Sequence, residues 1–461
     1  MIAGAFAAVV VAAASPAMSG SANQPSPAPT SAMTLAQAVD FGLAHNSKVL
    51  NAAATFAQAG ATLAAGRALT YPTAAGELQS QLLKSTSQGS FAPIGVTPST
   101  TFSQNTAALT GTFQGANLVN IYQARADKQA YDQANDQLYL TREQSISDTE
   151  TSFYTLVQDH QLTDVARENV NYNRVLMQIA EANFKAGKVA GLDRLRAQVS
   201  YTQALEQLAS ATADEEDQRE NLAQLINAPM SQQFVLPDAP PEPPLPNLDQ
   251  KVLDAVALAN RPEVGIAQAL LASSVISYYQ VDAPNRPFVS LNGGWGNQVS
   301  PTNNAQFYNQ CTTEGFPPSA CGPPSPSHFY QISIVSQWTL PLLDWGTVHA
   351  GHASARRAID ADTQAFESAK QQALIDVDQA ARRLLVDREN LRLATGNIAV
   401  ARQAALISAV QYKVGLASQT DVNQAQQQYL TAARDLLAAQ VAYVLGIVRL
   451  KLATGTLTEA V

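Results

Sequence analysis

Two hydrophobic patterns alternate along this chain of 461 residues. Some short segments alternate between apolar and polar positions, which is typical of a β-strand with one apolar face. The clearest covers residues 330–340, where Tyr330, Ile332 and Ile334 share one face. Other segments are long and contain neither Gly nor Pro, and one of these covers residues 116–186. At about 1.5 Å per residue, this segment predicts a helix roughly 100 Å long.

Four strands are expected in two pairs, one within about residues 75–113 and one within about residues 287–343. Strands of about 9–11 residues with one apolar face are typical of transmembrane β-barrels. The alternative is a soluble hairpin that buries one face. Four strands cannot close a barrel, because the smallest bacterial barrels have about eight and an open edge leaves backbone groups unsatisfied in lipid. If the strands enter a membrane, several chains must therefore share one barrel.

The long helices belong to a duplicated unit. Residues 184–208 match residues 412–436 at eight of 25 positions, with a constant offset of 228 residues. The identical positions are Lys185, Gly187, Asp193, Ala197, Gln198, Tyr201, Ala204 and Leu208. Further upstream the offset is 215, and we assign the difference to a loop at residues 301–326, because insertions in duplicated units commonly fall in loops. Each repeat is expected to run helix, strand pair, long helix, turn, helix.

These patterns divide the chain into six segments. They are a signal peptide (1–17), a disordered lead-in (18–33), a first repeat (34–236, with long helices at 116–228), a Pro-rich linker (237–247), a second repeat (248–455, with helices at 347–454) and a C-terminal tail (456–461). The apolar run at the start is too short to span a bilayer and precedes small residues that suit cleavage, which predicts export. No Lys or Arg occurs before Lys48, so either the true start lies upstream or this start is shortened.

Composition narrows the function classes. A net charge of −9 argues against a nucleic-acid partner and is compatible with a cation-tolerant pore or an ordinary soluble surface. Cys311 and Cys321 share one loop, which in an exported protein predicts a disulfide; two free thiols are the alternative. We find no phosphate-binding Gly loop, zinc-protease motif or nucleophile elbow, and interpret His349 and His352 as part of a helix start. No enzyme activity, cofactor or metal is expected.

Three features together resemble the TolC-like outer-membrane efflux factor family over about residues 34–455. They are the duplicated plan, the run LPLLDWG at residues 340–346, and Tyr412-x-x-Gly415 followed by Asp421. The resemblance implies an α+β, mainly α fold in which three chains contribute four strands each to a 12-stranded barrel in the outer membrane. Their long helical hairpins would continue as an α-helical barrel across the periplasm.

The function implied by the resemblance is a passive exit duct for a tripartite efflux pump or a type I secretion system. Such a homotrimer contacts outer-membrane lipid, a periplasmic adaptor (membrane fusion protein) and an inner-membrane pump. The alternative is an exported trimeric coiled-coil scaffold or adhesin without an open lumen, which an a/d-only heptad seam would favour. The helices instead carry Ala and Gln on several faces, which suits a wide cylinder. The cargo stays open between drugs, metals, solvents and polypeptides.

The resemblance also implies roles for residues at the helix turns. Gly187 and Gly415 would form the turns that contact the adaptor; plain hairpin turns are the alternative. Asp421 matches an aspartate that forms a ring at the tunnel constriction of the family, and Asp193 matches a carboxylate of the family's gate network. The alternative for both is an acidic residue that stabilises the first turn of a helix. A second ring aspartate would fall at Gln424.

One further position departs from the family pattern. The arginine that latches the counterpart of Asp193 would fall at Ala417. The latch and the double acidic ring are therefore both altered in this chain, and we expect a weaker or differently held closed state.

Overall fold

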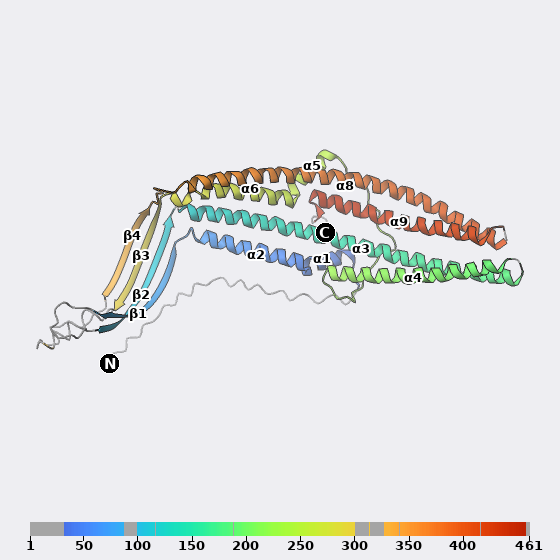
Figure 1. Ribbon diagram of the computed structural model, residues 1–461, viewed down its shortest axis with the longest axis horizontal. Helices are drawn as coiled ribbons and strands as arrows, with labels where there is room; N and C mark the ends of the chain where they lie inside the picture. The colour runs from blue at the N-terminus through green and yellow to red at the C-terminus, as the bar shows by residue number, and fades with distance from the viewer. Residues whose placement is uncertain are drawn as a thin grey trace. The chain divides into compact units, whose positions relative to one another are not determined.

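The computed structural model describes residues 32–86, 99–115, 117–187, 189–299, 313, 327–340, 342–414 and 416–457. The predicted signal peptide, nearly all of the predicted lead-in, Cys311, Cys321 and Gly415 lie outside these ranges. The chain divides into two compact units, whose helices and strands are labelled in Figure 1. Unit 1 comprises residues 1–50, 142–249 and 378–461, and unit 2 comprises residues 51–141 and 250–377. The units cut across the two sequence repeats, because each repeat contributes to both.

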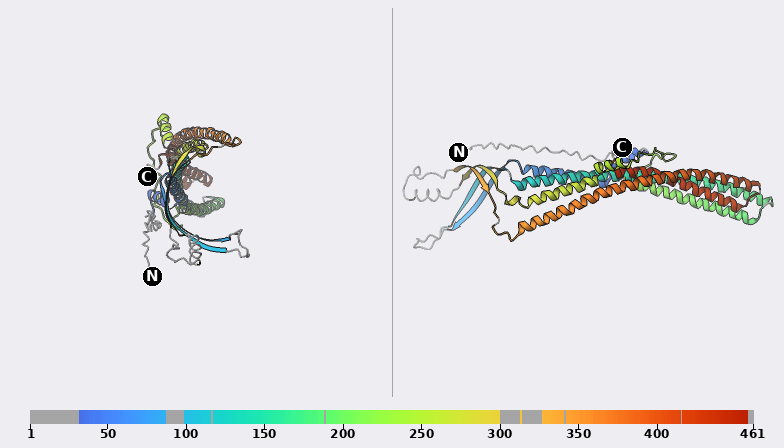
Figure 2. Two further views of the ribbon diagram at one scale, coloured as in Figure 1. Left: turned by 90° about the vertical axis from the view of Figure 1, so that its left-hand side faces the viewer. Right: turned by 90° about the horizontal axis from the view of Figure 1, so that it is seen from above.

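Unit 2 contains a four-stranded antiparallel sheet in the order β1-β2-β3-β4. The strands are β1 (Thr73–Thr86), β2 (Ser99–Gly115), β3 (Phe288–Val299) and β4 (Ser327–Gln337). The sheet is visibly curved when seen end-on (Figure 2). Since β1 and β4 each pair with one neighbour, both outer edges of this sheet are open among the residues that the structure describes.

One face of the sheet is apolar and exposed. The register aligns Leu109, Trp295 and Tyr330 in one row across β2, β3 and β4. These side chains are 55%, 60% and 87% exposed, and Ile332 and Ile334 continue the same face of β4. The opposite face carries hydroxyl groups. An exposed apolar face on a curved sheet is what lipid would cover.

The rest of unit 2 is helical. It contains most of α2 (Ser47–Ala68), the start of α3 (Leu118–Lys185), α5 (Gln250–Asn260), α6 (Pro262–Gln280), η1 (Ala283–Asn285) and the start of α8 (Thr347–Val414). Polar groups hold several of these helices together. Arg261, for example, donates to Asp376 at 2.7 Å and also pairs with Glu263 at 3.1 Å.

Unit 1 is built from α1 (Leu35–His45), the end of α3, α4 (Gly191–Leu225), the end of α8 and α9 (Gln419–Thr454). Its main apolar core joins residues from α1, α3, α4 and α9. Met33, which the sequence places in the lead-in, is fully buried in that core and forms a β-bridge with Phe234. Leu457, placed in the tail, is buried as well. The packed core of unit 1 therefore includes residues on both sides of the expected repeat boundaries at 34 and 455.

The Pro-rich linker lies along unit 1 at two defined points. Tyr443 donates its hydroxyl to the carbonyl of Pro243 at 2.9 Å, and the Gln161 side chain donates to the carbonyl of Asp238 at 2.8 Å. These bonds tie an extended segment, which lacks internal hydrogen bonds, to α9 and α3.

Both long helices run for 68 residues, which confirms the long hairpins expected from the sequence. Among the described residues, three helical segments are long and apolar enough to cross a membrane by length and composition alone: Pro262–Asn285, Thr347–Val414 and Gln419–Thr454. Half of the apolar window of α9 is buried within the chain. Packing inside the protein therefore accounts for half of the apolar window of α9.

Candidate functional site

The two helical hairpins of unit 1, α3–α4 and α8–α9, turn at the same end of that unit (Figure 1). At the first turn, Gly187 has φ +73° and donates its N–H to the carbonyl of Phe184 at 2.9 Å. Nothing lies within 4 Å of the position that a Cβ would take at Gly187. The turn therefore needs glycine for its backbone conformation and not for space. The matching Gly415 lies outside the described residues.

Asp421 completes the cap of α9. Ser418 is the N-cap residue, and its N–H and hydroxyl donate to Asp421 Oδ2 at 2.9 and 2.7 Å. The Asp421 N–H in turn donates to the Ser418 hydroxyl at 3.2 Å. These hydrogen bonds, led by the Ser418 side chain, lower the pKa of Asp421. The structure thus gives the carboxylate a defined local role and keeps it ionised at an exposed helix start.

Asp193, at the equivalent position of α4, has a different environment. Its N-cap residue is Ala190, which has no side-chain oxygen to form a cap. Asp193 instead lies 3.7 Å from Arg196. Burial raises the pKa of the Tyr412 phenol on α8, and the negative charge of Asp193 adds to that rise. Repeat-related aspartates therefore have different partners because Ser418 is replaced by alanine in the first repeat.

Tyr412 opens the motif that ends at Asp421, but the sequence assigned it no role in the site. It is 4% exposed, and its hydroxyl has no hydrogen-bond partner among the described residues. Together with Leu176 and Val422 it forms an apolar cluster that joins α3, α8 and α9. The sequence signal was available, since Tyr412 is the aromatic residue that pairs with Phe184 in the duplication.

Neutral contacts hold the two hairpins of unit 1 together near the turns. Ala417, where the resemblance would place an arginine, packs against the Tyr412 cluster. The amide of Gln426 donates to Asn169 at 3.1 Å, and Asn423 donates to Ser200 at 3.1 Å. Gln424 is exposed and does not contribute to these two hydrogen bonds. In this region the family pattern has an ion pair that this chain cannot form, because Ala417 replaces the arginine. Apolar packing and amide hydrogen bonds join the two hairpins there instead.

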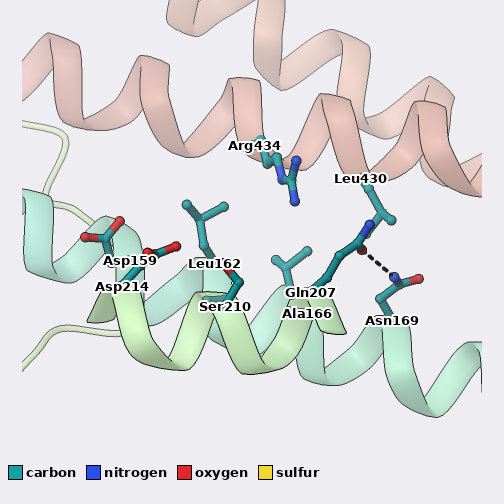
Figure 3. Close-up of a pocket in the computed structure, with 11 residues that line it drawn as sticks. Asp159, Leu162, Ala166, Asn169, Gln207, Ser210, Asp214, Leu430 and Arg434 are labelled. Atoms are coloured by element: carbon teal, nitrogen blue, oxygen red, sulfur yellow. Dashed lines mark hydrogen bonds between the residues drawn. The ribbon is translucent and has the colours of Figure 1, made fainter. Parts of the chain in front are cut away.

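A groove of about 400 Å³ lies between α3, α4 and α9, further from the turns (Figure 3). Asp159 and Asp214 lie together at one end, while Arg434 reaches in from α9. Burial, followed by the charges of Asp214 and Glu215, raises the pKa of Asp159 to about 6. His160 pairs with Glu215 at 2.7 Å. Among the described residues, no group of three or more His, Cys, Asp or Glu side chains is arranged to hold a metal ion.

Comparison with known proteins finds similarity to one family of outer-membrane proteins. Residues 255–456 match the model of the outer membrane efflux protein family. Nodulation protein T of Rhizobium leguminosarum bv. trifolii is 22% identical over 267 residues, which cover 57% of this chain and 52% of the relative. The match thus spans about half the length of that curated relative. The members of the matched family are channel proteins of the outer membrane.

Solved structures show the fold. The outer membrane channel CmeC of Campylobacter jejuni has a TM-score of 0.74 at 17% identity, covering 92% of this chain and 86% of that one. The outer membrane protein VceC of Vibrio cholerae has a TM-score of 0.73 at 16% identity, covering 91% and 96%. A mainly helical fold with four barrel strands per chain is therefore confirmed.

Proposed function

We propose that this protein is the outer-membrane exit duct of a tripartite efflux pump or a type I secretion system. The observation that carries the proposal is the curved four-stranded sheet, with an exposed apolar face and two open edges, on a chain that also forms long helical hairpins. Open edges in lipid are costly, so the sheet needs partners on both sides. Three copies would supply 12 strands, and a closed barrel of that kind has no edges.

The partners follow from the same proposal. The duct would be a homotrimer surrounded by outer-membrane lipid at the sheet, and its helical end would receive a periplasmic adaptor and an inner-membrane pump. The turn at Gly187, and the equivalent turn at Gly415, are the proposed adaptor contacts. The loop cysteines Cys311 and Cys321 are proposed to form a disulfide. Conduction would be passive, with the energy supplied by the pump.

Charged groups near the turns are the proposed gate and selectivity elements. In a ring of copies, Asp421 would present one ionised carboxylate per chain to the lumen, and Gln424 would present a neutral amide. Asp193 lies 3.7 Å from Arg196, and its charge acts on Tyr412, whose hydroxyl has no hydrogen-bond partner among the described residues. A rotation of the Asp193 side chain would exchange its contact with Arg196 in the same helix for a bond to Tyr412 in the other hairpin. We propose Asp193 and Tyr412 as a contact that differs between closed and open states.

The test has two stages. The native mass of detergent-extracted protein, corrected for detergent, is expected to correspond to three chains; a monomer found only in the soluble periplasm would refute the duct. The trimer is then expected to conduct ions across a planar bilayer, whereas a scaffold or adhesin without a lumen would not. Asp421→Asn keeps a capping side chain and is expected to reduce cation selectivity. Unchanged selectivity would remove Asp421 from the lumen without affecting the duct itself.

A further inference from the structure

The junction between the sheet and the helices of unit 2 carries a run of exposed apolar side chains. It begins at the end of β4, where Trp338 continues the apolar face of the sheet, and it ends just before α8. The large apolar side chains described in this run are all more than half exposed; they are Trp338, Leu340, Leu342, Leu343 and Trp345. Trp345 also has φ +50°, a backbone conformation that is costly for a bulky residue. The chain thus presents apolar surface at this end of the sheet that a further apolar partner would cover.

A cavity of about 610 Å³ lies beside this junction, between the end of α6 and the first turns of α8. Both helix ends lie next to the sheet (Figure 1). Basic and aromatic side chains provide much of the cavity lining; they are His349, His352, Arg356 and Arg357 from α8 and Tyr278 from α6. Such a cluster stands out in a chain that has only 28 Lys and Arg among 461 residues and a net charge of −9. The cavity is therefore a local basic site on an acidic protein.

The charge of Arg356 is not offset inside the chain. Its neighbour Arg357 pairs with Asp360 at 3.4 Å. Arg356 instead donates to the hydroxyl of Tyr278 at 3.2 Å and lies 5.6 Å from the centre of that ring, and it forms no ion pair with a carboxylate among the described residues. A guanidinium has five N–H donors, and the Tyr278 hydroxyl keeps its own proton when it accepts from Arg356. Both side chains therefore retain donors for an anion in the cavity.

The cavity and the apolar face of the sheet are joined through the same short helix, η1. Trp338 donates its indole N–H to the carbonyl of Asn285, the last residue of η1, at 3.1 Å. His352 Nε2 lies 2.9 Å from Asp282, the N-cap residue of η1. The buried Nδ1 of His352 has no hydrogen-bond partner among the described residues. Because side chains on a helix point toward its N-terminus, His352 and Arg356 lean toward the sheet. The basic site is thus continuous with the apolar face.

We propose that this cavity binds the phosphate group of an anionic phospholipid whose acyl chains lie along the apolar face of the sheet. Arg356 holds the phosphate through charge-assisted hydrogen bonds, and the Tyr278 hydroxyl donates to a phosphate oxygen. Trp338 and Trp345 lie at the level of the headgroups, where their amphipathic rings are favoured. A lipid fits better than a free phosphate ion, because only a lipid also covers the apolar junction. The inference rests on the proposed function, which places the sheet in lipid.

Quenching of tryptophan fluorescence by phospholipids with brominated acyl chains tests this site on the full chain, which has three tryptophans. Trp295→Phe leaves Trp338 and Trp345 as reporters of the junction. In vesicles that mix phosphatidylcholine and phosphatidylglycerol, with one of the two brominated, the quenching gives the preference for the anionic lipid. We expect a preference of about fivefold, the effect of one cation near a membrane surface. Arg356→Gln should abolish it, whereas Arg382→Gln, an exposed arginine further along α8, should leave it unchanged.

The outcomes separate this inference from the proposed function. Arg356→Lys keeps the charge and should retain most of the preference, which guards against a folding defect in Arg356→Gln. Equal quenching by both lipids before any change at Arg356, or the same preference after Arg356→Gln, overturns the site. Loss of the preference on adding inorganic phosphate, but not chloride at equal ionic strength, shows that the cavity binds free phosphate and overturns the lipid assignment.

A second reporter tests whether the sheet is in lipid at all. Trp338→Phe with Trp345→Phe leaves only Trp295, which lies on the apolar face of β3. Quenching of Trp295 by brominated phosphatidylcholine, with no preference at the junction, leaves the duct intact and refutes this site alone. Absence of quenching at Trp295 overturns the duct and this inference together.

Discussion

Replacing Asp159 with asparagine should make the stability of unit 1 less dependent on pH. Asp159 lies on α3 at the groove shared with α4 and α9, and burial together with Asp214 and Glu215 raises its pKa from 3.8 to about 6. His160 is engaged with Glu215, and Arg434 reaches into the same groove from α9. Asparagine preserves the shape of the side chain but cannot acquire a charge.

The sign and size follow from linkage. A raised pKa means that the folded state holds the proton more tightly than the unfolded state, so this stabilisation is complete below about pH 4 and is lost as pH rises through about 6. The shift corresponds to an upper bound of about 3 kcal/mol. Because Asp159 is partly exposed to a groove open to water, screening reduces the expected effect to about 1 kcal/mol per chain.

The assay is thermal unfolding of the helical signal in mild detergent at pH 4, 5, 6 and 7.5. Relative to the unmodified chain, Asp159→Asn should gain stability between pH 4 and pH 6, and the gain should then stay constant. Asp148→Asn, an exposed aspartate of the same helix, is the matched control and should show no such gain. If Asp159→Asn and the unmodified chain follow the same curve from pH 4 to pH 7.5, the groove does not hold Asp159 as described.

Three further substitutions probe the region of the turns. Gly187→Ala should destabilise the α3–α4 tip by about 1–2 kcal/mol, because an L-residue is strained at φ +73°; faster hydrogen exchange limited to that tip would show it. Ser418→Ala should cost about 1 kcal/mol of cap stability and raise the pKa of Asp421, measured by carboxylate NMR titration, whereas Ser200→Ala on α4 should not move that pKa. Gln426→Leu should cost about 1–3 kcal/mol in thermal unfolding, since it leaves the buried Asn169 without this partner; an effect below that of an exposed Gln424→Leu control would contradict the contact.

Fold-level features could be predicted because their signals are local. A stretch without Gly or Pro specifies a long helix, and strict alternation specifies a strand with two unlike faces, whatever the rest of the chain does. The register that places Leu109, Trp295 and Tyr330 in one row needed the structure, since the first strand pair alternates weakly. The early order at Met33 was missed because its burial depends on distant core residues of unit 1.

The candidate site was harder to predict because equivalent sequence positions do not have equivalent surroundings. Asp193 and Asp421 occupy matching places in the duplication, yet one N-cap is Ala190 and the other is Ser418. The sequence did carry this difference, because Ser418-x-x-Asp421 is a capping-box pattern and Ala190-x-x-Asp193 is not. The motif and the duplication both contain Tyr412, but neither shows that its hydroxyl lacks a hydrogen-bond partner among the described residues, because a buried tyrosine and a buried phenylalanine fit the same hydrophobic pattern.

A second pair of aspartates shows how the duplication has diverged around one position. Asp387 is the equivalent of Asp159, but it is 1% exposed and lies 3.1 Å from the guanidinium of Arg383. Gly446 on α9 lets that helix approach, since a Cβ there would lie 3.0 Å from Leu384 and 3.4 Å from Asp387. Burial raises the pKa of Asp387 while Arg383 and Arg449 oppose the rise. At Asp159 the charges of Asp214 and Glu215 add to the rise instead. The second repeat therefore encloses its carboxylate beside cations that oppose the rise in pKa, whereas the first repeat leaves Asp159 in an open groove beside two acidic side chains that add to it.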